Sequence, residues 1–348
     1  MKKIKTIFCI AAVVAIASPQ LFSQSVSYEY KENDSHKSNF NIALHLFDAD
    51  YTSKQSITLG YGISTNLAIR KIASVDFCFD KTYSASTDLN YHSATNGIYD
   101  LSTTNTPIRY SHFELGGMFH LVDRTHTAKR KITIGSSSGY RGLHQVTTTS
   151  YLMIPTEVRS IFGIRGGLYH YATSINDHDQ GVIKDAIKGV GDGGVVADDG
   201  TEFGGAVSDY NSVYYNTKAV TNMRVNGFYA GISSTQFYSV AIDADGYSKS
   251  MSNRTFSRFY LDAIIAPPVI DDFITKDGKS HKVSGGSAKG FETRSAGARL
   301  GFETVKLGNA VAIYYRVEGG VKPGLAAQKF YFNVGFGLAI RGKIKFLG

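Results

Sequence analysis

His112, Glu114 and His120 are the residues of this chain whose types and spacing come nearest to a catalytic group. They keep one parity in a segment of alternating polar and apolar residues, so we expect them on one face of a β-strand. Residues two apart on a strand lie about 6.5–7 Å from each other, which would let His112 and Glu114 share acid–base chemistry or a metal. The alternative is an ordinary polar network in a barrel lumen, and we favour it because barrel interiors are polar.

Two glycine-rich segments match the spacing of catalytic or cofactor motifs. Residues 189–194 (GVGDGG) have the spacing of a dinucleotide-binding loop, and residues 135–139 (GSSSG) have that of a nucleophile elbow. Both motifs work only where a strand runs into a helix. The first segment lies in an Asp- and Gly-rich stretch of a chain expected to be exported, so we interpret it as a loop. A nucleophile elbow also needs a nearby acid and His, so we interpret the second segment as a Ser- and Gly-rich turn. No cofactor is expected.

An acidic segment offers hard oxygen ligands of the kind that calcium prefers. It spans residues 173–222, but no window fits the twelve-residue EF-hand loop, because position twelve counted from Asp177 is Lys188. We therefore favour a solvated loop and leave calcium binding open. The acidic residues concerned are Asp177, Asp179, Asp192, Asp198, Asp199 and Glu202.

Charged residues recur at the parity that would face inward if the chain formed a barrel. The first interpretation is ion pairing between strands that fills and stiffens the lumen, and the second is a cationic constriction that favours anionic solutes. We favour ion pairing, since side chains and inward loops can fill a barrel of this size. The predicted lumen-lining residues are His112, Glu114, His120, Arg165, Arg258, Asp262, Arg299, Glu303, Arg316, Glu318, Arg341 and Lys343.

The elements that must position these residues are long alternating strands. The clearest is the segment 330–348, where one parity is almost wholly apolar and the other is polar, small or cationic. Similar alternation recurs along the chain, often over ten or more residues, against five or six in most globular sheets. The pattern predicts an all-β fold, a transmembrane antiparallel up-and-down β-barrel of 12–14 strands, with 14 preferred. A soluble β-sandwich is the alternative.

The N-terminal segment predicts export. Lys2, Lys3 and Lys5 precede an apolar run, 7–17, that is too short to span a membrane as a helix, which is typical of a signal peptide. With a cut near Gln24, the domains are a signal peptide at 1–24 and a barrel at 25–348. Its long surface loops would be 173–222, with a short helix at 182–188, and 267–289. Residues 143–172 would form one very long strand or two.

Composition excludes several classes of protein. Tyr and Phe are abundant (22 and 21) and Gly numbers 36, as girdles and twisted strands of a barrel require. The formal charge of +8 falls to +5 without the three signal lysines, and no dense basic run exists, so a nucleic-acid partner is not expected. Cys78 is the single cysteine of the mature chain, which leaves no internal disulfide and no cysteine-built zinc site.

Two neighbouring segments carry a resemblance to a known group. Residues 150–155 (SYLMIP), followed by 164–169 (IRGGLY), resemble a pattern in Bacteroidota outer-membrane β-barrel proteins of the PorT-like group, where Tyr-Leu-Glu-Ile-Pro precedes a Gly-rich aromatic strand. Met153 stands where that pattern has Glu. The resemblance covers about twenty residues and implies an outer-membrane location, but it transfers no catalytic residue because the pattern marks strands.

These patterns together predict a Gram-negative outer-membrane barrel without enzymatic activity. It would act as a pore, or as a structural or partner-binding component of an envelope assembly. Its expected partners are outer-membrane lipid and envelope-complex proteins. The alternative is an enzyme that acts on lipid or peptide at the barrel rim, for which His112, Glu114 and His120 are the candidates.

Overall fold

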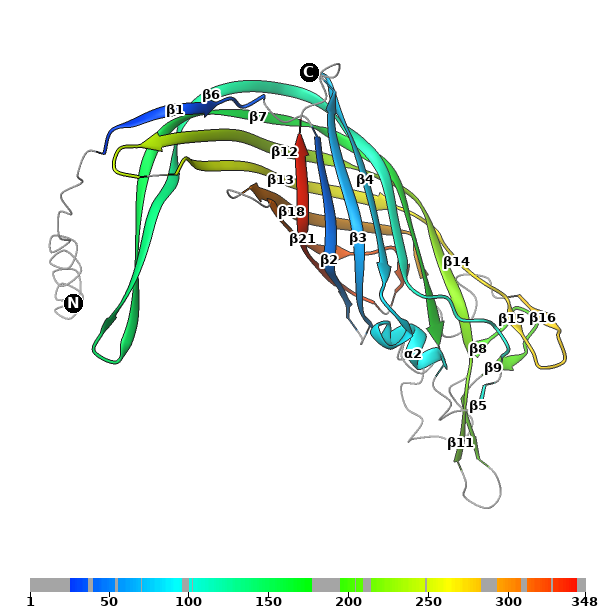
Figure 1. Ribbon diagram of the computed structural model, residues 1–348. Coiled ribbons are helices and arrows are strands. Elements are labelled where there is room, and N and C mark those ends of the chain that lie inside the picture. Colours follow the sequence, from blue (N-terminus) through cyan, green and yellow to red (C-terminus); the bar gives the residue numbers. More distant parts are fainter. Residues whose placement is uncertain are drawn as a thin grey trace, which may run out of the picture.

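Ten long strands form a closed antiparallel barrel (Figure 1). The computed structural model describes residues 26–36, 40–53, 56–69, 71–95, 100–101, 103–176, 195–203, 205–208, 214–247, 249–282, 293–307, 312–326 and 328–342. The barrel strands are β2 (Phe40–Thr52), β3 (Ser56–Ile69), β4 (Ala73–Thr82), β6 (Ser111–Arg141), β7 (His144–Asn176), β12 (Val220–Ala244), β13 (Met251–Ile265), β18 (Ala296–Leu307), β19 (Ala312–Val321) and β21 (Tyr331–Gly342).

The barrel closes between β7 and β12, whose pairing runs from Asn176↔Val220 to Val158↔Tyr238. Each other barrel strand pairs with its neighbour in the order β12-β13-β18-β19-β21-β2-β3-β4-β6-β7. The predicted all-β antiparallel barrel is confirmed, and it closes with ten strands where twelve to fourteen were expected. The difference arises because single strands are longer than expected: residues 143–172 fall almost wholly within β7, which has 33 residues.

Alternation along each strand separates an apolar outside from a polar inside. In β13, Phe259 and Leu261 are exposed, whereas Tyr260 and Asp262 between them are buried. All ten barrel strands carry large exposed apolar side chains. A continuous exposed apolar surface of this extent is unusual for a protein surrounded by water, because soluble monomers keep such patches small. It is the surface expected of an outer-membrane β-barrel.

The two ends of the barrel differ. At one end, which we call the turn end, strands are joined by short connections such as 70–72 between β3 and β4 and 245–250 between β12 and β13. At the other, the loop end, lie the longer connections. These contain η1 (Ala85–Thr87), α2 (Leu89–Thr95), β5 (Asp100–Leu101), β8 (Val195–Val196), β9 (Glu202–Phe203), β10 (Gly205–Ser208), β11 (Tyr214–Lys218), β14 (Pro268–Ile270), β15 (Phe273–Ile274), β16 (Ser280–His281), β17 (Thr293–Arg294) and β20 (Gly324–Leu325).

The loop end has a packed apolar core of its own. Buried side chains of β7 and β12, among them Tyr171 and Met223, pack with Phe203 and Phe273 of the connecting segments. The described parts of the two predicted loops, 173–222 and 267–289, lie at this end, but 173–176 still belong to β7 and 220–222 already belong to β12. The short helix expected at 182–188 lies outside the described residues. Within the described part of the chain, no helix is long and apolar enough to cross a membrane.

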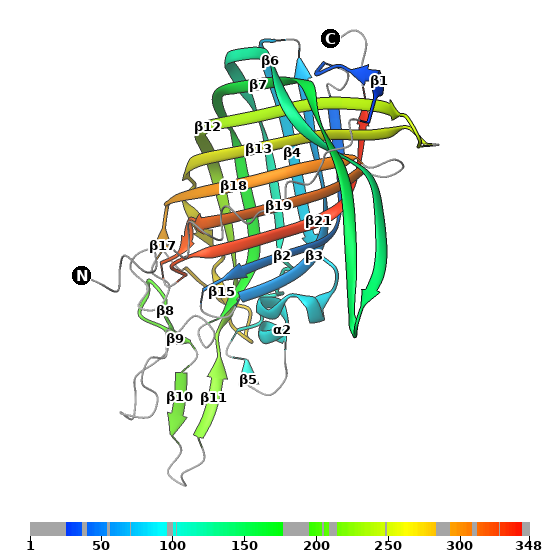
Figure 2. The same cartoon turned by 90° about the vertical axis from the view of Figure 1, so that its left-hand side faces the viewer.

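At the turn end, the β6–β7 hairpin continues far beyond the barrel (Figures 1 and 2). Strand β4 pairs with β6 only as far as Ala73↔Phe119, but β6 and β7 stay paired to Arg141↔His144. Gly142, with φ of 65°, begins the two-residue turn between them, a conformation that glycine adopts without strain. We call residues 121–157 the arm. A short strand, β1 (Tyr28–Asn33), pairs with the end of β12 beside it.

Candidate functional site

The barrel interior holds three groups of ion pairs, each of which joins strands on opposite sides of the lumen. In the first group, Arg258 of β13 donates to Asp76 of β4 and contacts Glu303 of β18, both at 2.7 Å. Asn66 of β3 also donates to Asp76, at 2.6 Å. Because β13 and β4 lie far apart in the strand order, this bridge crosses the lumen.

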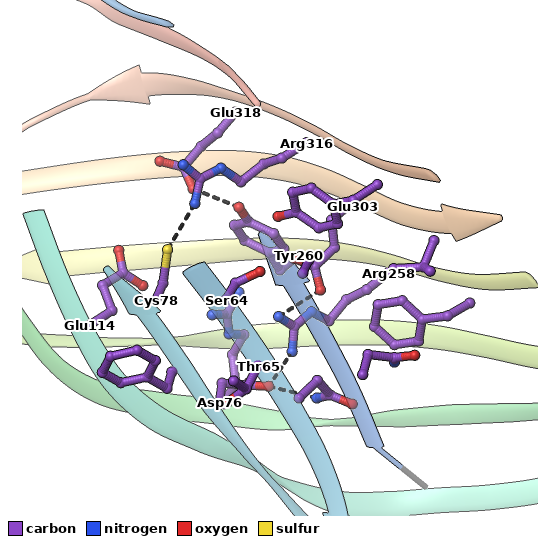
Figure 3. Close-up of a pocket in the computed structure, with 18 of the residues that line it drawn as sticks. Ser64, Thr65, Asp76, Cys78, Glu114, Arg258, Tyr260, Glu303, Arg316 and Glu318 are labelled. Carbon is purple, nitrogen blue, oxygen red and sulfur yellow. Dashed lines mark hydrogen bonds and ion pairs between the residues drawn. The ribbon is translucent and has the colours of Figure 1, made fainter. Parts of the chain in front are cut away.

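The second group surrounds Arg316 of β19. Its guanidinium donates to Asp48 of β2 at 2.6 Å and to Asp80 of β4 at 2.9 Å. The same guanidinium lies 2.9 Å from the sulfur of Cys78 (Figure 3). His45 of β2 completes the group, with Nδ1 at 2.8 Å from Asp80. The guanidinium thus lies between two buried carboxylates that would otherwise repel each other.

The third group surrounds Arg299 of β18. Its guanidinium donates to Glu114 of β6 and to Asp262 of β13, in each case at 2.8 Å, and lies 3.4 Å from Glu318 of β19. Arg165 of β7 contacts Asp262 at 3.4 Å. Charge-assisted pairs of this kind are the strong hydrogen bonds of protein interiors. We call the three groups together the lumen network.

Tyrosine side chains lie between these groups. Tyr260 donates to Glu318 at 2.6 Å, and Tyr331 donates to the other oxygen of the same carboxylate at 2.5 Å. The guanidinium of Arg165 lies over the ring of Tyr260, 4.3 Å from its centroid. The aromatic rings therefore occupy space that charged groups leave and also contact the cations through their faces.

Little space remains among these side chains. One cavity of about 40 Å³ lies between Asp76, Cys78, Glu114, Arg258 and Tyr260 (Figure 3). A water molecule needs roughly 10–15 Å³ by the same measure, so the cavity has room for about three or four waters. Among the described residues, the lumen at this level is filled rather than open.

His112 and Glu114 lie together, as their spacing suggested, but His120 does not join them. The Nε2 atom of His112 lies 2.9 Å from Glu114, and its Nδ1 atom lies 3.1 Å from Asp80, so His112 links the second and third groups. His120 lies beside Asp123, at 3.9 Å, near the turn end. His120 keeps the same parity but lies six residues beyond Glu114 along β6, about 20 Å at the rise of a strand, so it belongs to another level of the barrel.

The other predicted lumen residues have the following places. Arg165, Arg258, Asp262, Arg299, Glu303, Arg316 and Glu318 are buried in the network. Arg341 is half-buried near the end of β21, and Lys343 lies outside the described residues. Carboxylates outnumber arginines in the network, which gives no special support to a cationic constriction. The carboxylates are Asp48, Asp76, Asp80, Glu114, Asp262, Glu303 and Glu318, and the arginines are Arg165, Arg258, Arg299 and Arg316.

Sequence reasoning missed His45, Asp48, Asp76 and Asp80 as site residues. Asp76 and Asp80 alternate with apolar residues in β4, so the parity argument used for the arginines would have found them. Asp48 follows a β-bulge between His45 and Phe47, where β2 shifts its register against β21. A bulge changes which residues face inward, so simple alternation could not assign Asp48.

Two sets of side chains in the second group have the types and closeness of metal ligands. They are Cys78, Asp80 and His112, and His45, Asp48 and Asp80, with ligand atoms within 4.8 Å of one another in each set. Arg316 contacts Cys78 of the first set, Asp48 of the second and the shared Asp80. The guanidinium therefore already supplies a positive charge at the place where both sets converge.

Neither glycine-rich motif lies at a strand-to-helix turn in the described part of the chain. Residues 135–139 lie inside β6, on the arm, and not at a strand-to-helix turn. Residues 189–194 lie outside the described residues. Of the acidic residues considered for calcium, Asp199 accepts a hydrogen bond from the backbone of Thr201 at 3.0 Å and contacts His281 at 2.7 Å. Calcium binding stays untested.

Comparisons with known proteins find solved structures of low similarity. No protein-family model matches the chain, and no curated protein matches it. Solved structures similar to it include outer-membrane expressed OmpT of Vibrio cholerae, with 7% identity, a TM-score of 0.19 and coverage of 90% of this chain and 100% of that one. A loop L8 deletion mutant of the same protein has 7% identity, a TM-score of 0.18 and coverage of 91% and 100%. Likenesses this distant carry no argument about fold or function.

Proposed function

We propose that this chain is an integral outer-membrane β-barrel without enzymatic activity, with a lumen closed to solutes, that serves as a structural or partner-binding component of the envelope. The exposed apolar side chains on all ten strands support insertion in a bilayer. The expected signal peptide, in residues outside the described part, would bring the chain there. The PorT-like resemblance of 150–155 and 164–169, both within β7, belongs to the same proposal.

The observation that carries the closed lumen is the set of ion pairs across it. Arg258–Asp76, Arg316–Asp80 and Arg299–Glu114 each join opposite walls, and a cavity of only about 40 Å³ remains between them. We therefore expect that hydrated ions and small solutes do not pass, since the gap has room for only about three or four waters. The partner-binding surfaces of such a barrel would then lie at its two ends.

Short turns and long connections indicate which end faces which compartment. Bacterial barrels place short turns on the periplasmic side and long loops outside. By this rule the turn end, with the arm, would face the periplasm and the loop end would face the exterior. The proposal places the arm where envelope proteins can reach it.

Single-channel conductance in a planar bilayer tests the closed lumen. We expect no steady channels from the wild-type protein. We expect channels from a variant in which Asp76, Arg258 and Glu303 are all replaced by alanine, because this removes one group of ion pairs across the lumen. Replacing all three residues together leaves none of them as a buried charge without its partner. Steady channels in the wild type would overturn the proposal, as would recovery of the protein wholly in the soluble periplasm.

The second candidate is an enzyme that acts on lipid or peptide. The observation in its favour is the chain of hydrogen bonds from Asp80 through His112 to Glu114, which resembles the arrangement of groups that relay protons. Its residues lie inside the lumen, whereas the sequence suggested a site at the rim. Replacement of His112, Glu114 and His120 by alanine should leave lipid and peptide hydrolysis by the purified protein unchanged if the first proposal holds; loss of a measured activity would favour the enzyme.

A further inference from the structure

The arm is anchored near its middle, although it extends past the barrel. Ile132 and Ile134 of β6 and Ile154 of β7 pack in one buried cluster with Val240 and Ile242 of β12. The arm therefore folds against the extended ends of the neighbouring strands and has an apolar core of its own. A hairpin anchored in this way can present a fixed surface, which an isolated two-stranded hairpin in water rarely does.

One edge of the arm is open. On one side β6 pairs with β7 throughout, but beyond Phe119 no described strand pairs with its other side. The interactions along that side are from side chains, such as the bond from Asn253 to the backbone oxygen of Lys131 at 2.9 Å. The outer edge of β7 also has no described strand paired with it before Val158, but side chains of β1 contact its backbone, from Tyr30 to Pro155 and from Asn33 to Glu157. The open edge of β6, roughly 20 residues long, can accept another strand.

Exposed cations lie on both faces of β6 in the arm: Lys129 and Lys131 share one parity, and Arg124 has the other. Arg124, Lys129 and Lys131 are exposed, and Lys131 lies over the ring of Tyr151 at 4.0 Å from its centroid. The arm contains two acidic residues, Asp123 and Glu157, and Asp123 is paired with Arg159. Lysines on an edge strand disfavour pairing with a second copy of the same edge, since like charges would face each other. The same charges favour an acidic strand.

We propose that the arm is a docking edge for an extended, acidic segment of an envelope protein, which adds to β6 as a further strand. Backbone hydrogen bonds along the edge would supply affinity, and Lys129 and Lys131, which share one face of β6, would select acidic side chains. The proposal rests on the proposed function, which puts the arm in the periplasm, and it names the chemistry of the partner.

Peptide binding to the full-length protein in detergent micelles tests the inference. The probe is a fluorescent ten-residue peptide of alternating threonine and glutamate, compared with a threonine–lysine peptide and with an acidic peptide carrying proline at alternate positions. We expect binding of the first alone. Hydrogen exchange should show protection of backbone amides in 123–141 when it binds. Equal binding of the proline peptide would overturn strand addition, because proline cannot donate the required bonds.

Charge reversal provides the matched control. Lys129→Glu with Lys131→Glu should weaken binding of the acidic peptide by at least about tenfold. Lys279→Glu with Lys282→Glu, two exposed lysines at the loop end, should leave it unchanged. Binding to phosphatidylglycerol vesicles but not to the peptide would overturn the inference in favour of a lipid surface, and concentration-dependent self-association through the arm would overturn it in favour of a second copy.

The two proposals fail in different ways. Steady channels from the wild-type protein would contradict the closed lumen but would not contradict peptide docking at the arm. Absence of peptide binding by a protein that is folded, membrane-inserted and silent in a bilayer would contradict the arm alone.

Discussion

At the scale of single residues, the interior depends on cations placed between carboxylates. Arg299 is 2% exposed and contacts Glu114, Asp262 and Glu318. Removing one member of a buried group leaves the others charged and without a counter-charge, which costs far more than removal of an exposed pair. The burial of each arginine, more than the number of its bonds, therefore determines the cost of its loss.

Arg299→Ala should lower the free energy of unfolding by about 3–5 kcal/mol, because three buried carboxylates lose their shared cation. Arg224→Ala is the control: Arg224 contacts Asp271 at 2.6 Å, but its side chain is 47% exposed, so its loss should cost no more than about 1 kcal/mol. Urea unfolding of both variants in micelles, followed by far-ultraviolet circular dichroism, measures the difference. Equal losses would contradict the structural role of the network.

Gly301 gives a second test at this scale. A Cβ atom placed there would meet the ring of Tyr260, whose hydroxyl holds Glu318. Gly301→Ala should therefore displace Tyr260 and cost about 1–3 kcal/mol, as overpacking usually does. Gly139→Ala on the arm is the control, since a Cβ atom there meets nothing within 4 Å. Thermal unfolding of the two variants should separate them; similar midpoints would show that Tyr260 can move at little cost.

At the scale of elements, the alternation of polar and apolar residues predicted which side chains face the interior. It did not predict the lengths and ends of the strands. Residues such as Asp262 and Arg299 were assigned to the interior from alternation alone, because every second residue of a strand faces the same side. The bulge at His45–Phe47 shifted the register in β2, so Asp48 was missed. The arm was missed for another reason: its Ser- and Thr-rich end has the composition of a turn, and only pairing between β6 and β7 keeps it extended.

The contact between the β8–β9 turn and β16 at the loop end should depend on pH. The pKa of Asp199 is lowered to about 2, chiefly by the hydrogen bond from the backbone of Thr201 and then by the bond with His281. A lowered carboxyl pKa means that the interaction stabilises this region above about pH 4 and is lost as the pH falls through about 2. The carboxyl carbon shift of Asp199, followed by NMR between pH 1 and 5, should show this midpoint.

His281→Ala should raise that midpoint toward the ordinary value of about 4, while leaving the contribution of Thr201. A midpoint that does not move would show that His281 contributes nothing to the ionisation of Asp199. Lys279→Ala, a change two residues away that leaves His281 in place, is the control.

At the scale of the whole molecule, the outside of the barrel and the arm require different surroundings. Ile164 and Met153 belong to the same strand and are similarly exposed, at 53% and 51%. Ile164 lies on the apolar outside of the barrel, and Met153 lies on the arm. If a bilayer surrounds the barrel, only the first of these side chains faces lipid.

Ile164→Arg should therefore destabilise the protein in lipid bilayers by about 2–4 kcal/mol, the cost of an arginine at the midplane on the lipid face. Met153→Arg should cost less than about 0.5 kcal/mol, as exposed substitutions in water do. Reversible urea unfolding in phospholipid vesicles measures both. A large effect at Met153 or none at Ile164 would contradict the proposed position of the bilayer.

The ion pairs across the lumen also have a consequence for how the chain folds. Their members are distant in sequence: 182 residues separate Asp76 from Arg258, 185 separate Glu114 from Arg299, and 236 separate Asp80 from Arg316. Contacts between such distant residues form slowly, because long loops must close first. A partly assembled sheet would carry these charges unpaired on its concave side, where water keeps them solvated. Closure of the barrel should therefore be cooperative and occur late in folding. The charged side chains lose their hydration only when β7 pairs with β12.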